Sequence, residues 1–211
     1  MKHKPVQAVP RERLFSLDAL RGFDMFWITG GGYLVAVLAK YTGAGWLKVL
    51  ADQMEHAEWA GFHFEDLIFP LFMFISGVAI PFALGSKLEK KVPKDELAKK
   101  VVKRGLTLVL LGFVYNGVFS NGFEHPRFAS VLGQIGLAYL FASLIFIYSK
   151  SFKSRLYWLG GILVGYGIVQ LLIPVPGVGA GVLTPEGCIN GYIDRGFLTG
   201  RLHGEVYDPE G

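Results

Sequence analysis

Cysteine is nearly absent from this chain, since Cys188 is the only one among 211 residues. One thiol cannot form a disulfide within the chain, so cysteine usage says nothing about how the fold is held together. The sequence also lacks HExxH and CxxC patterns, which leaves zinc binding as a minor alternative. Charged residues make up only 18% of the chain, below the roughly 25% of soluble domains. This low charge indicates that the chain is not an ordinary soluble domain.

The sequence contains four long runs without a charged side chain. They occur at 67–86, 105–123, 128–149 and 156–185. Each is close to or longer than the roughly 20 residues that a helix needs to cross hydrocarbon. A soluble protein of this size would rarely carry four such runs. The sequence therefore predicts an all-α, polytopic transmembrane helical bundle. We expect about five spanning helices, at 17–39, 67–86, 105–123, 129–149 and 156–173.

The basic residues are distributed unevenly around these spans. The isoelectric point near 9.1 could suggest a nucleic-acid partner, but 15 of the 21 Lys and Arg residues fall on one side of the bundle. The positive-inside rule assigns that side to the cytoplasm. The basic balance therefore reflects topology and contact with the lipid bilayer, and we expect no nucleic-acid partner.

This topology divides the chain into three parts. We expect a cytoplasmic tail at 1–12, a transmembrane region at 13–173 with an outer loop at 40–65, and a second outer loop at 174–211. An odd number of spans leaves the end of the chain outside. We therefore expect an N-terminal piece of a longer protein, although a complete five-span protein is the alternative. Association with further copies of the chain is left open.

Charged residues lie inside the first expected span. Asp18, Arg21 and Asp24 stand three apart, so on a helix they share one face, with Arg21 between two carboxylates. Charge within a span is costly and usually faces a cavity or a partner. The cluster is either a polar site near the cytoplasmic side that holds an anionic group, or a self-neutralising group at headgroup level.

Glycines interrupt the same span. Gly30, Gly31 and Gly32 weaken a helix and permit either local unwinding or a close approach of another helix. We favour an unwound helix lining a substrate path, because unwound backbone persists in membranes only where protein or a cavity covers it. In the fifth span, Gly161 and Gly165 predict a helix-packing face.

Histidines precede the second span. His56 and His63 lie among carboxylates just before the uncharged run that begins at Leu67, and Asp66 is expected to cap that helix. Imidazole titrates near neutrality and can take a proton from an incoming amine or hydroxyl. We therefore take His56 as a candidate base or nucleophile. The alternative is a pair of surface histidines in an outer loop.

Several motifs resemble a known family at this point. Residues 13–22 (RLFSLDALRG) resemble the opening of multispan membrane acyltransferases. Residues 56–61 (HAEWAG) followed by 66–70 (DLIFP) are similar to the heparan-α-glucosaminide N-acetyltransferase family and its bacterial relatives. Three later landmarks agree and occur in the family's order. They are 171–177 (LLIPVPG), 191–195 (GYIDR) and 205–211 (EVYDPEG).

The resemblance implies a function and a set of site residues. It implies acetyl transfer from cytoplasmic acetyl-CoA to an amino sugar or glycan on the outer face, with His56 as the catalytic residue and no metal. It also implies further spans beyond this chain and, through the bacterial members, a bacterial inner membrane. The substrate-binding candidates within the motifs are Trp59, Asp66, Asp194 and Arg195. The candidates for binding the acetyl-CoA donor are Arg21 and Asp18.

Two features depart from the heparan enzymes. Ile28 occupies the position where they have an asparagine before the glycines, and the segment from the glycines to His56 is longer. Heparan itself is therefore not carried over as the acceptor. A membrane transporter and a non-catalytic family member remain the alternatives to an enzyme.

Overall fold

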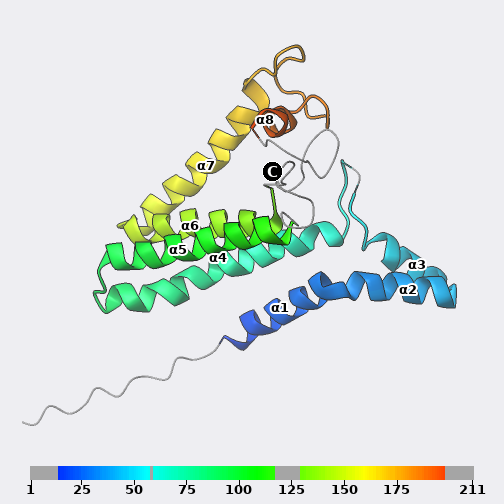
Figure 1. The fold of residues 1–211 in the computed structure, drawn as a ribbon, viewed down its shortest axis with the longest axis horizontal. Helices are drawn as coiled ribbons and strands as arrows, with labels where there is room; N and C mark the ends of the chain where they lie inside the picture. The colour runs from blue at the N-terminus through cyan, green and yellow to red at the C-terminus, as the bar shows by residue number, and fades with distance from the viewer. Residues whose placement is uncertain (1–13, 58, 117–128, 198–211) are drawn as a thin grey trace, which may run out of the picture. The chain divides into compact units, whose positions relative to one another are not determined.

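The chain is an all-helical membrane protein. The computed structural model describes residues 14–57, 59–116 and 129–197, and within these ranges the regular elements are helices, apart from one isolated bridge between Val175 and Gly179 (Figure 1). The helices form two compact units, with the division inside α4 after Ile75. In chain order the elements are α1 (Phe15–Phe26), η1 (Trp27–Gly31), α2 (Gly32–Thr42), α3 (Gly45–Asp52), α4 (Glu65–Glu89), α5 (Lys94–Tyr115), α6 (Val131–Tyr148), α7 (Phe152–Leu172) and α8 (Ile189–Phe197).

Four of the helical segments are long and apolar enough to cross a membrane. They are Phe15–Thr42, Glu65–Glu89, Val131–Tyr148 and Phe152–Leu172. The other expected span, 105–123, corresponds to the apolar second half of α5, and its positions 117–123 lie outside the described residues. Because α5 begins directly after Pro93, the charged stretch before that span is helical rather than an extended loop.

The first unit contains a broken helix. α1 and α2 are joined by the five-residue π-helix η1, in which Gly30 adopts φ 133° and ψ 13°. This backbone conformation is nearly restricted to glycine, because a Cβ would clash with the chain. The unwinding that the three glycines predict is therefore confirmed. α2 ends at Gly43, which has φ 65°, and α3 follows as an amphipathic helix that packs on α2.

Glycines also control the packing of the second unit. In α5 and α6, which lie side by side, a Cβ on Gly136 would be 2.7 Å from the carbonyl oxygen of Gly105 and 2.9 Å from the Cβ of Leu108 (Figure 1). The two backbones are in direct contact at this point, as small residues permit between membrane helices. The buried core beside this contact consists of Ile80, Leu84, Leu97, Val101 and Ile147.

Two expectations about helix packing and the chain's last part need revision. No atom lies within 4 Å of a Cβ placed on Gly161 or Gly165, so these glycines make no close helix contact among the described residues. The stretch after residue 174, expected to be a loop, contains α8. Gln170 donates a hydrogen bond to the side-chain oxygen of Asn190 at 2.6 Å, which joins α7 to α8.

Candidate active site

The segment between α3 and α4 carries the candidate catalytic residue. We call residues 53–64 the histidine loop; position 58 within it is not described. The backbone N–H of Glu65 donates to the carbonyl of Gln53 at 3.0 Å, so the two ends of the loop are held together. This closure brings residues ten positions apart, His56 and Asp66, into reach of each other.

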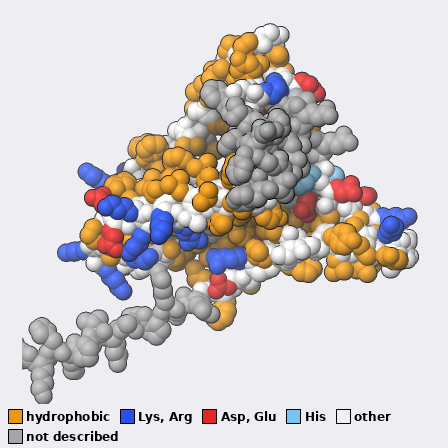
Figure 2. Space-filling model, viewed as in Figure 1, with side chains coloured by type: hydrophobic (Ala, Val, Ile, Leu, Met, Phe, Trp, Pro, Cys, Tyr) orange, Lys and Arg blue, Asp and Glu red, His pale blue; other side chains and the backbone are white. Residues whose placement is uncertain are grey.

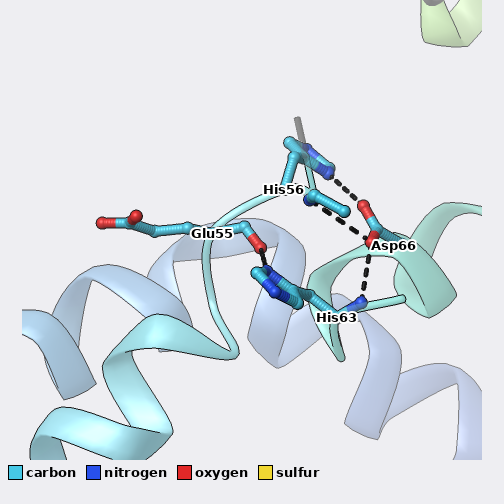
Figure 3. A network of polar contacts seen from close by, with 5 residues as sticks. Glu55, His56, His63 and Asp66 are labelled. Atoms are coloured by element: carbon cyan, nitrogen blue, oxygen red, sulfur yellow. Dashed lines mark hydrogen bonds and ion pairs between the residues drawn. The ribbon is translucent and has the colours of Figure 1, made fainter. Parts of the chain in front are cut away.

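His56 and Asp66 form a hydrogen-bonded pair. Nδ1 of His56 lies 2.8 Å from Oδ1 of Asp66 (Figure 3). A carboxylate has no hydrogen to give, so Nδ1–H is the donor and the lone pair of Nε2 is left to accept a proton. A carboxylate holding an imidazole in this tautomer is the arrangement that hydrolases and transferases use to orient a histidine base.

The second oxygen of the Asp66 carboxylate holds the loop in place. Oδ2 accepts a hydrogen bond from the backbone N–H of His63 at 2.8 Å and a longer one from that of Ala57 at 3.5 Å (Figure 3). Asp66 lies in the first turn of α4, where the helix dipole favours a negative charge. The prediction that Asp66 caps the helix is wrong, because Asp66 is the second residue of α4 and its carboxylate accepts from N–H groups that precede the helix. The carboxylate instead orients His56, which its position in the sequence did not predict.

His63 supports the loop rather than pairing with His56. Its Nδ1–H donates to the backbone carbonyl of Glu55 at 2.7 Å, and its own N–H is bonded to Asp66 (Figure 3). Both contacts fix the backbone on either side of the catalytic candidate. Sequence spacing could not reveal this role, because a bond to a backbone carbonyl leaves no trace in the pattern of side chains.

Exposure distinguishes the two members of the pair. The His56 side chain is 74% exposed, whereas that of Asp66 is 28% exposed. A substrate can therefore approach the imidazole while the carboxylate behind it is partly screened from water. Trp59, three residues along the loop, is 41% exposed and supplies an aromatic surface near the histidine in sequence.

The histidine loop packs against the broken helix. The ring of Phe64 makes edge-to-face contacts with Trp27 at 5.3 Å and Phe23 at 6.4 Å between centroids. At Gly32, an added Cβ would lie 3.3 Å from the Cβ of Met54 and 3.7 Å from a carboxylate oxygen of Glu65. The glycines thus provide both features left open above, unwinding at Gly30 and close approach at Gly32.

The charged cluster in α1 is split. Arg21 lies 3.6 Å from Asp18, and both side chains are about half exposed. Asp24 is buried instead, and both of its carboxylate oxygens lack a hydrogen-bond partner among the described residues. The expectation that Arg21 is bracketed by two carboxylates is therefore wrong for Asp24.

The remaining predicted site residues belong to the second unit. Asp194 is buried in α8, and Arg195 donates to the backbone carbonyl of Glu186 at 3.2 Å. The Arg195 bond joins α8 to the segment that leads into it. Within the described ranges, no group of three or more His, Cys, Asp or Glu side chains is arranged to hold a metal ion.

Sequence comparisons identify the family. Residues 13–168 match the family described as a domain of unknown function, DUF5009. The chain belongs to this family. Among curated proteins, this DUF5009 chain is 27% identical to the mouse heparan-alpha-glucosaminide N-acetyltransferase, over 96% of the chain and 37% of that protein. It is 29% identical to the human protein of the same name, over 94% of the chain and 35% of that protein. The chain thus spans little more than a third of the length of these relatives.

Proposed function

We propose that this protein is a membrane acetyltransferase that moves an acetyl group from acetyl-CoA to an amino sugar or another glycan. The observation that carries the proposal is the His56–Asp66 pair, which leaves Nε2 of an exposed histidine able to accept a proton. The similarity to two proteins named as N-acetyltransferases supports the type of reaction. Because the departure at Ile28 separates this chain from the heparan enzymes, the proposed acceptor is wider than heparan.

The proposed chemistry needs one base. A thioester is already activated, so the acceptor amine or hydroxyl attacks its carbonyl carbon as Nε2 of His56 removes the acceptor's proton. The new N–C or O–C bond forms, the C–S bond breaks, and the proton passes from the imidazolium to the CoA thiolate. Asp66 stabilises the imidazolium charge that develops during this exchange, as a carboxylate on Nδ1 does in other histidine bases.

The distribution of basic residues supports an assignment of the histidine loop to one face of the membrane. With the N-terminus and the basic segments in the cytoplasm, the histidine loop lies on the outer face. The donor and the acceptor then approach His56 from opposite sides of the membrane, and the broken helix beside the loop is the element suited to bring the thioester to it. A bacterial inner membrane remains part of this proposal.

The other candidate residues have proposed roles in binding. Arg21, which is half exposed near the cytoplasmic end of α1 beside Asp18, suits a phosphate of acetyl-CoA. Trp59 offers an aromatic face of the kind that stacks on sugars, and Asp194 and Arg195 are proposed to contribute to acceptor binding.

A transporter is the second candidate. The unwound backbone at Gly30 favours it, because discontinuous membrane helices commonly line substrate sites in transporters. It predicts movement of a solute without consumption of acetyl-CoA. A transport pathway does not require an exposed histidine that is oriented by a carboxylate, so we place the enzyme first.

The test uses the full-length protein in proteoliposomes with radiolabelled acetyl-CoA and a panel of amino sugars and glycans. We expect label on at least one sugar, and loss of that transfer in His56→Ala. Lys48→Ala, an exposed change in α3, is the matched control and is expected to retain activity. Full transfer by His56→Ala would exclude the histidine as base, and solute flux without acetyl-CoA turnover would favour the transporter.

A further inference from the structure

A groove runs along the exposed face of α5 in the second unit. Its volume is about 750 Å³, and Tyr148 at the end of α6 lines it beside Asp95. The other lining residues recur every three or four positions along α5, so they form one stripe on that helix. They are Ala98, Lys99, Val102, Lys103, Leu106, Thr107 and Leu110.

One end of the groove carries two lysines and one carboxylate, which leaves a net positive charge. Lys99 and Lys103 are both exposed, stand one turn apart, and form no ion pair within the described part of the chain. The neighbouring Lys100 differs, because its ammonium group lies 2.6 Å from the carboxylate of Glu96. Asp95 accepts a hydrogen bond from the Tyr148 hydroxyl at 3.2 Å. Two like charges one turn apart repel, so an anion between them would be stabilising.

The other end of the groove is apolar. Leu106 is 55% exposed and Leu110 is 63% exposed, and α5 has no charged residue after Arg104. Figure 2 shows the same change in character, with Lys and Arg side chains gathered around the start of α5 and hydrophobic side chains beyond them. From Lys99 to Leu110 the groove covers about 16 Å of helix, at roughly 1.5 Å per residue.

We propose that this groove binds an anionic phospholipid, with the phosphate between Lys99 and Lys103 and an acyl chain along Val102, Leu106 and Leu110. The order of the lining residues, cationic and then apolar, matches the order of a phospholipid from headgroup to chain. A nucleotide or a free phosphate would use only the cationic end and leave the apolar half exposed. The position also fits, because basic clusters at the cytoplasmic end of membrane helices attract anionic headgroups.

The site is tested with the full-length protein in mild detergent, equilibrated with phosphatidylglycerol and phosphatidylcholine. Native mass spectrometry counts the lipids retained. We expect preferential retention of phosphatidylglycerol, and a loss of about tenfold or more in Lys99→Gln/Lys103→Gln, since each lysine near an anionic surface contributes appreciably. The control Lys87→Gln/Lys90→Gln removes the same charge from exposed positions at the end of α4, outside the groove, and is expected to retain the lipid.

A second variant tests the apolar half without changing charge. Leu106→Trp places a large ring in the groove from an exposed position, so we expect it to fold normally and to lose phosphatidylglycerol. Equal retention by wild type and the groove-lysine variant would overturn the proposal, and so would equal loss in the control variant. Displacement of the lipid by inorganic phosphate or by CoA at equal concentration would also overturn it, because it would indicate a soluble anion as the occupant. None of these outcomes depends on acetyl transfer.

Discussion

Replacing Gly136 by leucine tests the close contact between α5 and α6. A Cβ at this position would lie 2.7 Å from the Gly105 carbonyl oxygen. Carbon–oxygen contacts across helix interfaces are normally about 3.3 Å or longer, so the helices would have to separate by about 0.6 Å for the Cβ alone. The remaining atoms of leucine enlarge that displacement, and the obstructing atom is backbone, which cannot rotate aside.

Two opposing energies determine whether Gly136→Leu raises or lowers the stability of the protein. Overpacking destabilises a protein by about 1–3 kcal/mol and occasionally more. Replacing a helical glycine by a good helix former stabilises it by about 1 kcal/mol. The obstruction by backbone places Gly136→Leu at the upper part of the overpacking range, so we expect a net loss of about 2 kcal/mol. The matched control is Gly160→Leu in α7, where no atom lies within 4 Å of an added Cβ, so only the favourable term applies.

The assay is unfolding of the protein in detergent, followed by circular dichroism during heating or SDS titration. We expect Gly136→Leu to unfold earlier than wild type and Gly160→Leu to unfold at the same point or later. Equal stability of the two variants would refute the argument that α5 and α6 touch through their backbones at this glycine.

Three further predictions concern single residues. Gly30→Ala forces a side chain into positive φ, which costs about 1–2 kcal/mol. We therefore expect lower thermal stability than in the control Gly22→Ala, where φ is not positive and no atom lies within 4 Å of an added Cβ. Equal stability of the two variants would show that the helix straightens freely at Gly30. His63→Ala removes a hydrogen bond across the histidine loop, so we expect the protein to lose about 1 kcal/mol of stability. We also expect a lower kcat with an unchanged acceptor preference. An unchanged kcat would exclude a positioning role for His63. The hydrogen bond from Lys100 lowers the pKa of Glu96, so by NMR this carboxyl is expected to titrate below the usual glutamate range and to return to it in Lys100→Ala; its small stabilising effect is present at neutral pH and is lost as the pH falls through that lowered pKa. A midpoint that stays where it is in Lys100→Ala would contradict the assigned cause.

Hydropathy predicted the architecture because the membrane limits the possible structures. A helix bonds its own backbone without water, and a run of about 20 uncharged residues has the length of a spanning helix, so 129–149 and 156–173 correspond to α6 and α7. The three glycines likewise predicted the break in the first span, since few other residues allow the conformation at Gly30.

The pairing of residues across the histidine loop could not be predicted in the same way. His56 was a candidate from its type and neighbours, but its contact with Asp66 depends on how the loop closes between Gln53 and Glu65. Helix packing was missed for a similar reason. Gly161 and Gly165 have the spacing of a packing motif, yet the close contact forms at Gly136, because the partner helix rather than the spacing decides which glycines are covered.

The account's central claim is that Asp66 acts on acetyl transfer through His56. The measurement that tests it most directly is a double-mutant cycle on kcat for acetyl transfer, with His56→Ala, Asp66→Asn and the double variant in the full-length protein. We expect Asp66→Asn to lower kcat by about a hundredfold, within the range that a positioned base contributes. In the His56→Ala background the same change is expected to have no further effect, because residues that act as a unit are not additive. Independent, additive losses, or an Asp66→Asn variant within twofold of wild type, would contradict the claim.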